Sequence, residues 1–290
     1  MKYLVRHRTV YDFADKVAES HHLARLRPLV VAGQRCLTHH LQIEPVPQVR
    51  VERVDAFGNV FVFFAQQAAY EKLIVEAVSE VETSPGVVTD LEGSPPWEVV
   101  VDALAEDLRA VHLEAQPFRF PTAQVPVSEF LADYARPSFT PGCAILAAAR
   151  DLTGRIFRDF KFDPLATTIS TPVETVLKQK RGVCQDFAHL AIGCLRSLGL
   201  AVRYVSGYLE TAPPPGKPRL VGADASHAWI SVYCPGVGWV DFDPTNNCIP
   251  GQRHVRLAMG RDYSDVSPLR GVVFGGGGEQ PKVSVDVLPQ

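Results

Sequence analysis

Apolar and polar residues alternate over roughly the first 80 positions with the two-residue period of β-strands. Leu37, Leu41 and Ile43 alternate with polar neighbours, and a turn at 55–59 precedes the apolar run Val60–Phe64. Several short strands in series, with no helix between them, are typical of antiparallel β-proteins. We therefore predict an N-terminal antiparallel β-sandwich over residues 1–90.

Helical periodicity begins after a loop rich in Ser, Gly and Pro at 84–97. Thr140 and Pro141 have the sequence of an N-cap and first-turn pair. The helix that they are expected to begin carries an apolar side from Ile145 to Phe160.

Two further helices are expected after this one. Residues Thr171 to Glu174 have the sequence of a capping box, in which the Glu174 side chain reaches back to the Thr171 amide. Gly182 is expected to end that helix. The next helix should begin at about Cys184, because apolar residues recur at helical spacing after it, and Gly199 should end it.

Strand-like segments follow the helices, so the second part of the chain is expected to be α+β, with an antiparallel sheet after the helices. We predict a core over 91–265 and a glycine-rich tail with a terminal strand over 266–290. The strands are expected at 201–208, 228–233 and 239–242, with an exposed loop at 213–216 and a last strand at 282–288.

Charge and composition exclude some functions. The chain has 290 residues, a net charge of −3 and a pI near 6.3, which gives no reason to expect nucleic-acid binding. No apolar stretch is long enough to cross a bilayer, and the N-terminus lacks the apolar block of a signal peptide. We therefore expect a soluble, cytoplasmic protein without membrane contact.

The six cysteines have no Cys-x-x-Cys pair and are expected to be reduced. Cys184 lies in the predicted first turn of a helix, where free N–H groups and the helix dipole favour a thiolate. The same N–H groups are candidates to hold an oxyanion. Cys194 instead falls on the apolar face of that helix. Because a cysteine at a helix start is more often structural than catalytic, position alone does not decide its role.

A thiolate that performs acyl transfer needs an imidazole to accept and donate a proton. His227 precedes a predicted strand, and Asp243 ends the next one. If these strands pair antiparallel, the carboxylate meets the imidazole from behind and fixes its tautomer. Asp241 projects to the same face as Asp243 and is the alternative partner. His189 lies five residues after the candidate cysteine, on another side of its helix, and we interpret it as structural.

Four segments of the core carry sequence motifs: Arg181–His189, Ser206–Tyr208, Asp224–Trp229 and Gly238–Thr245. Together they resemble motifs of bacterial transglutaminase-like proteins, a papain-related superfamily of cysteine proteases and transglutaminases. The N-terminal part also resembles the β-domain that precedes the core in that group, including its turn at 55–59.

The resemblance implies a transglutaminase-like core, with helices packed on an antiparallel sheet. It also implies that Cys184 is the nucleophile, His227 the general acid and base, and Asp243 the orienting residue. The family's cores generally work without a metal or an organic cofactor. The calcium sites and additional β-domains of animal transglutaminases have no equivalents in this sequence, which argues against calcium-regulated cross-linking.

The predicted function is acyl transfer from a peptide or protein amide through a thioester, with hydrolysis favoured, as in a cysteine protease or amidase. One alternative is a transglutaminase with an amine acceptor, and another is a non-catalytic binding module on the same fold. A third is a zinc site that uses Cys184 and His227 with Cys234 or Cys248. Whether Asp186 assists the site stays open, and the loop at 213–216 is predicted to overhang the cleft.

Overall fold

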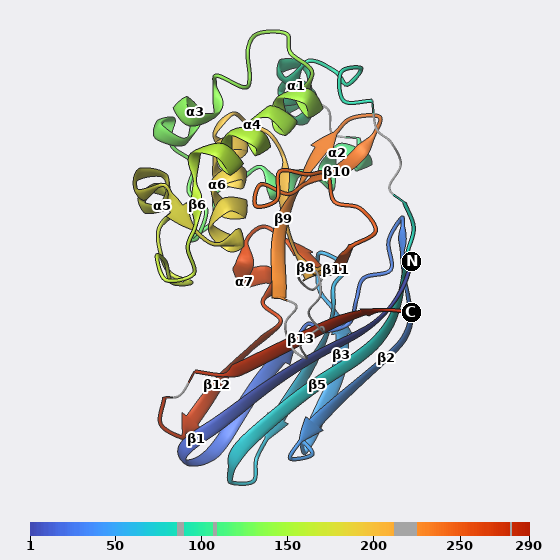
Figure 1. Cartoon of the computed structure of the whole chain (residues 1–290), viewed down its shortest axis with the longest axis vertical. Coiled ribbons are helices and arrows are strands. Elements are labelled where there is room, and N and C mark those ends of the chain that lie inside the picture. Colours follow the sequence, from blue (N-terminus) through green and yellow to red (C-terminus); the bar gives the residue numbers. More distant parts are fainter. Residues whose placement is uncertain (86–89, 107–108, 212–224, 279) are drawn as a thin grey trace, which may run out of the picture.

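The chain forms three layers in a computed structural model that describes residues 1–290 apart from 86–89, 107–108, 212–224 and 279 (Figure 1). Helices cover one face of a four-stranded antiparallel sheet, and a curved seven-stranded sheet forms the other half of the molecule. The predicted α+β class, with an antiparallel N-terminal part and a core of helices on an antiparallel sheet, is confirmed.

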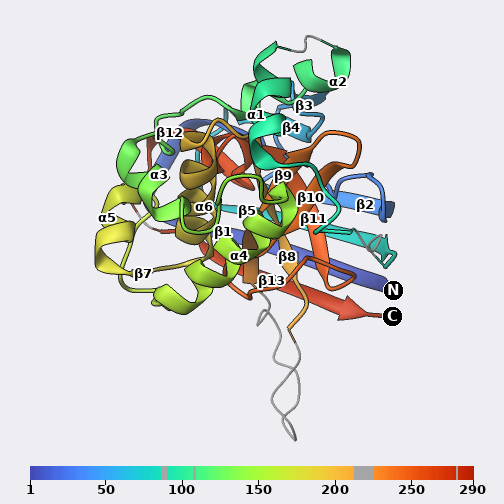
Figure 2. The ribbon, with the colours of Figure 1, turned by 90° about the horizontal axis from the view of Figure 1, so that it is seen from above.

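The seven-stranded sheet is built around one strand of 23 residues, and all of its pairings are antiparallel. Its strands are β1 (Lys2–Ala24), β2 (Gln34–Glu44), β3 (Val49–Val54), β4 (Val60–Gln66), β5 (Tyr70–Thr83), β12 (Leu269–Gly275) and β13 (Lys282–Pro289). The first half of β1 lies between β5 and β13, whereas its second half lies between β4 and β12. The N- and C-termini consequently lie side by side (Figure 2).

The alternation read from the sequence determines which residues of this sheet are buried. In β5, Leu73, Val75 and Ala77 point into the core. In β2 a register shift between Cys36 and Thr38 leaves Leu37 exposed, although the rest of the strand keeps its alternation.

The turn before β4 forms as predicted. The Asp55 carboxylate accepts hydrogen bonds from the N–H groups of Phe57 and Asn59, and Gly58 takes a positive φ of 84°.

The four-stranded sheet has the order β10-β9-β8-β11, and its strands are also antiparallel. They are β8 (Val202–Leu209), β9 (Ala225–Cys234), β10 (Gly238–Phe242) and β11 (His254–Gly260). The first three are the strands predicted from the sequence, and β11 was not predicted.

The helical layer is made of α1 (Trp97–Glu106), α2 (Ala110–Leu113), the 3-10 turn η1 (Gln116–Phe118), α3 (Glu129–Ala135), α4 (Ile145–Asp159), α5 (Val173–Gln179) and α6 (Cys184–Ser197). A short α7 (Tyr263–Val266) follows β11, and β6 (Lys161–Phe162) pairs in parallel with β7 (Arg181–Gly182). Central to this layer, α6 contacts α3, α5 and β9. It ends at Ser197, and Gly199, which follows the C-cap residue Leu198, has a positive φ of 86°.

The predicted start of α4 at Thr140 and Pro141 was wrong. Residues 140–143 form a turn closed by the Cys143 N–H on the Thr140 carbonyl, and Gly142 takes a positive φ of 77°. A residue in that conformation interrupts a right-handed helix, so α4 begins only at Ile145.

The predicted ends of α5 were also wrong. The Thr171 hydroxyl accepts a hydrogen bond from the Thr168 N–H, and Pro172 occupies the N-cap position without a side-chain cap. The helix ends at Gln179, and the C-cap residue Lys180 adopts the left-handed conformation with φ 55°. Gly182 lies beyond this end, in β7.

A second hydrophobic core joins the two sheets. Tyr208, Val255 and Leu257 of the four-stranded sheet are buried together with Val5 and Val287 of the seven-stranded sheet. This packing brings β1 and β13 against the four-stranded sheet. Within the described residues, no helix is long and apolar enough to span a membrane.

Candidate active site

Cys184 is the first residue of α6, and neighbouring contacts fix the helix start. The Asp186 carboxylate accepts hydrogen bonds from the Val183 N–H at 2.8 Å and from the Thr167 hydroxyl at 2.6 Å. A Cβ at Gly182 would lie 2.6 Å from this carboxylate, so the chain entering the helix is tightly packed. Cys184 is thereby held where the free N–H groups and the positive end of the helix dipole lie.

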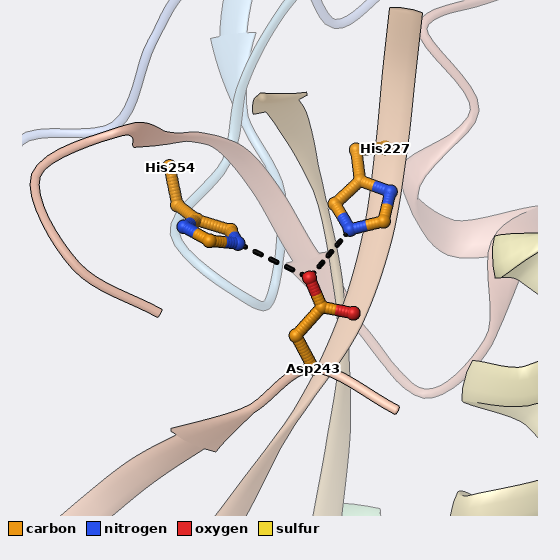
Figure 3. Close-up of side chains that lie close together, drawn as sticks. All are labelled: His227, Asp243 and His254. Carbon is orange, nitrogen blue, oxygen red and sulfur yellow. Dashed lines mark hydrogen bonds and ion pairs between the residues drawn. The ribbon is translucent and has the colours of Figure 1, made fainter. Parts of the chain in front are cut away.

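His227 and Asp243 come from adjacent strands and meet in the protein interior (Figure 3). His227 lies on β9, and Asp243 directly follows β10, whose last residue Phe242 pairs with Ile230. The His227 Nε2 is 2.7 Å from the Asp243 Oδ2, and both side chains are buried. The structure therefore brings together this predicted pair.

The Asp243 carboxylate is saturated with hydrogen-bond donors. Its Oδ1 accepts from the backbone N–H groups of Thr245 and Asn246, and its Oδ2 accepts from His227, His254 and the Asn246 side chain. Burial raises the pKa of Asp243, but these hydrogen bonds outweigh burial and hold its pKa well below the ordinary value. The carboxylate therefore stays ionised at neutral pH.

The same contacts make His227 a strong base. Burial lowers the pKa of His227, but its hydrogen bonds with Asp243 and Cys184 raise that pKa to about 9. Because the ring presents Nε2 to Asp243, Nδ1 is the nitrogen left for the thiol. An imidazolium in this position at pH 7 favours a thiolate beside it.

His254 is a site residue that sequence reasoning missed. It begins β11, and its Nε2 lies 3.1 Å from the Asp243 Oδ2 (Figure 3). Its Nδ1 accepts a hydrogen bond from the Gly251 N–H, so the ring proton is on Nε2 and is donated to the carboxylate. The signal that could have revealed it is the largely apolar run 255–259, which indicates a buried strand with a histidine at its start.

The two alternative residues are occupied elsewhere. The Asp241 carboxylate accepts hydrogen bonds from Trp229 Nε1 at 2.9 Å and from Arg256 Nε at 2.8 Å. His189 Nε2 accepts a hydrogen bond from the Tyr263 N–H at 3.1 Å, and burial lowers its pKa to about 4. The ring of His189 is therefore neutral at pH 7, which agrees with its interpretation as a structural residue.

The other cysteines differ from Cys184 in their surroundings. All six are free thiols. Burial raises the pKa of Cys194 to about 12 and that of Cys234 and Cys248 to about 11. These three thiols are thus protonated at neutral pH and poorly nucleophilic.

The predicted zinc ligands are not assembled into one group. In the described part of the chain, the His, Cys, Asp and Glu donor atoms close enough to share a metal ion belong to His227, Asp243 and His254, with no cysteine among them. Both histidines donate to one carboxylate oxygen, and these hydrogen bonds account for the close spacing of the three side chains.

A pocket of about 520 Å³ opens over Cys184 and His227. Its lining comes from both halves of the molecule and includes Tyr204 of β8 and Thr9 of β1. The predicted overhanging loop at 213–216 falls outside the described residues.

Cys184 thus lies at a helix start and shares a pocket with a histidine–aspartate pair on an antiparallel sheet. Cysteine acyl-transfer proteins have this arrangement. Residues 3–82 match the bacterial transglutaminase-like N-terminal region, and residues 133–244 match the transglutaminase-like superfamily. A protein of Mycobacterium tuberculosis is 41% identical over 297 residues, which cover 99% of this chain and 93% of that protein. The chain belongs to the transglutaminase-like superfamily.

Two further proteins show how far this similarity extends. A protein-glutamine gamma-glutamyltransferase of Pseudomonas aeruginosa is 28% identical over 160 residues, which cover 50% of this chain but 23% of that enzyme. A solved structure from Cytophaga hutchinsonii, described provisionally as a cysteine protease, has a TM-score of 0.77 and 22% identity and covers 100% of this chain and 91% of its own. The latter establishes the fold over the whole chain.

Proposed function

We propose that this protein is a cysteine-nucleophile enzyme that hydrolyses amide or peptide bonds, with Cys184 as nucleophile, His227 as general acid and base, and Asp243 as orienting residue. The observation that carries the proposal is the 2.7 Å contact between His227 Nε2 and Asp243 Oδ2, in a ring that lines the same pocket as Cys184. An ionised carboxylate behind the ring fixes the tautomer and stabilises the imidazolium.

In the first half-reaction, the Cys184 thiolate attacks the carbonyl carbon of the substrate and a C–S bond forms. The carbonyl oxygen becomes an oxyanion, for which the free N–H groups in the first turn of α6 are the nearest candidate donors. When the C–N bond breaks, the His227 imidazolium gives its proton to the departing amine. The products are a thioester on Cys184 and a free amine.

In the second half-reaction, neutral His227 removes a proton from water, and the resulting hydroxide attacks the thioester carbonyl. The C–S bond breaks, the carboxylic acid product leaves, and the Cys184 thiolate and the His227 imidazolium are restored. Asp243 stays ionised throughout, because its five hydrogen bonds favour the charged form.

Hydrolysis is favoured over amine transfer by the character of the pocket. Among its described lining residues there is no Asp or Glu to attract a cationic amine acceptor such as a lysine side chain. The named glutamyltransferase among the relatives keeps amine transfer as the second candidate. Incubating the protein with a glutamine-containing peptide and a fluorescent alkylamine separates the two, since hydrolysis releases ammonia without incorporating the amine.

The test of the proposal is the alkylation rate of Cys184 by iodoacetamide between pH 5 and 10, in the parent protein and in His227→Ala. We expect rapid alkylation at pH 6 that is lost in the variant. Peptide mass spectrometry separates Cys184 from the other thiols, and Cys184→Ala provides the blank. A Cys184 that reacts like a free thiol and ignores the His227 change would support a non-catalytic binding module instead.

A further inference from the structure

We propose that β1 and β13 of the seven-stranded sheet form one wall of the subsite for the acyl group, and that this subsite accepts an uncharged side chain. The inference rests on the proposed function, because it assigns a substrate class to the same site. Its substrates are peptides or amides in which the residue that supplies the attacked carbonyl is neutral, such as Leu or Gln.

The pocket over Cys184 is shared between the two halves of the molecule. The core supplies Cys184 and His227, whereas β1 supplies Thr9 and Tyr11 and β13 supplies Val283. Thr9 and Val283 are direct partners in the pairing of β1 with β13. The wall is therefore a continuous piece of sheet, held beside the core by the hydrophobic cluster that joins the two sheets.

Strand alternation keeps charge away from this wall. Successive side chains of a strand point to opposite faces, so the residues between those of the wall face the other way. A separate hollow on that opposite face is lined by Arg6, Arg8, Glu76, Ser284 and Asp286. The charged residues of the same strands are thus gathered on the face that does not meet Cys184.

β1 contributes two titratable residues to the pocket lining, His7 and Tyr11. Burial raises the pKa of Tyr11, so its phenol is neutral at pH 7, and His7 is also uncharged there. Its Nε2 contacts the Thr9 hydroxyl at 3.0 Å, and its Nδ1 contacts the Tyr208 hydroxyl at 3.0 Å. Burial lowers the pKa of His7 to about 4, so the ring is neutral at pH 7. The hydrogen bond with Tyr208 ties β1 to β8, and the neutral ring adds no charge to the wall.

The remaining described lining is apolar or neutral. Ile169, Leu269 and Val283 border the pocket, and Ile169 is 61% exposed. Apart from the reacting pair, Cys184 and His227, no lining residue in the described part of the chain carries a charge at neutral pH. A carboxylate or ammonium group that entered this subsite would lose hydration and gain no counter-ion from its walls.

The experiment uses N-acetyl chloromethyl ketones of Leu, Gln, Glu and Lys, which carry the same reactive group on different side chains. Gln and Glu have nearly the same shape, so their ratio of inactivation rates reports charge alone. We expect the Leu and Gln reagents to inactivate Cys184 at least tenfold faster than the Glu and Lys reagents at pH 7. Equal rates for Gln and Glu would overturn the inference.

Two variants locate the subsite. Val283→Lys places a cation on the wall, and because Val283 is 53% exposed the change is accommodated. We expect it to raise the Glu-to-Gln rate ratio about fivefold, the effect of a single favourable charge at short range. Ser284→Lys adds the same charge one residue away on the opposite face and should leave that ratio unchanged. Equal responses of the two variants would show that β13 is not the wall.

The outcome distinguishes this inference from the proposed function. If Cys184 is alkylated by iodoacetamide in a manner that depends on His227, but all four ketones react alike, only the subsite assignment fails. If Cys184 is inert toward iodoacetamide and toward every ketone, the proposed function fails, and the inference that rests on it fails as well.

Discussion

Replacing Asp243 with Asn should lower the alkylation rate of Cys184 at pH 6 by about 10²-fold. The variant keeps the size of the side chain and removes its charge. His227 is buried, and without the carboxylate the effect of burial, which lowers its pKa, is no longer outweighed. The imidazole would then be neutral at pH 6, and the thiolate would lose its cationic partner.

The magnitude follows from the fraction of thiolate. In the parent, a histidine with a pKa of about 9 is fully protonated at pH 6 and can hold Cys184 as a thiolate. An ordinary cysteine titrates near 8.5, so about 0.3% of it is thiolate at that pH. The helix dipole is unchanged by the substitution and retains part of the activation, which reduces a loss of about 300-fold to roughly 10²-fold.

The assay is the second-order rate constant for iodoacetamide at Cys184, measured by peptide mass spectrometry at pH 6. Asp241→Asn is the matched control, since it makes the same change two residues earlier, at a carboxylate that serves Trp229 and Arg256. Thermal melting establishes that both variants are folded. If Asp243→Asn alkylates within threefold of the parent, the carboxylate does not sustain the ion pair and the reasoning is wrong.

Three further predictions test other parts of the site. Above pH 9, kcat/KM for hydrolysis of a peptide substrate should fall, because neutral His227 cannot protonate the leaving amine. The rate of iodoacetamide alkylation should stay on its plateau, and parallel pH profiles of the two reactions would contradict this prediction. His254→Ala removes a donor from buried Asp243 and should destabilise the protein by about 1–3 kcal/mol in urea unfolding, and an unchanged midpoint would show that the hydrogen bond is dispensable. Gly207→Ala should destabilise by about 3 kcal/mol, since its Cβ would lie 2.2 Å from a carbonyl oxygen of β11, and wild-type thermal stability would refute this.

Local sequence patterns predicted the parts of the site that depend on local structure. Cys184 was placed at a helix start because the apolar period begins just after it, and α6 does begin there. The pairing of the His227 and Asp243 strands followed from their closeness in the chain, since consecutive strands joined by a short turn pair antiparallel. These features need only neighbouring residues to be specified.

Features that depend on distant contacts were missed. His254 reaches Asp243 because β11 pairs with β8, where His254 lies opposite Leu209. The strands β9 and β10 lie between Leu209 and His254 in the sequence, so this pairing is not a local one. The start of α4 depends on the positive φ of Gly142, which a helical apolar period does not report. In both places a backbone conformation or a strand order decides the outcome, and hydrophobic periodicity carries information about neither.

The strand order also explains why both halves of the molecule line the pocket over Cys184. β13 ends the chain and β1 begins it, yet they pair side by side, with Tyr3 opposite Pro289. A pocket wall made from these two strands requires residues 3–10 to pair with residues 282–289. The thiol and its histidine, by contrast, lie within the core and are brought together by α6 and β9. The architecture therefore separates the reacting groups, which lie on α6 and β9 of the core, from the surface proposed to select the acyl group, which lies on the paired strands β1 and β13.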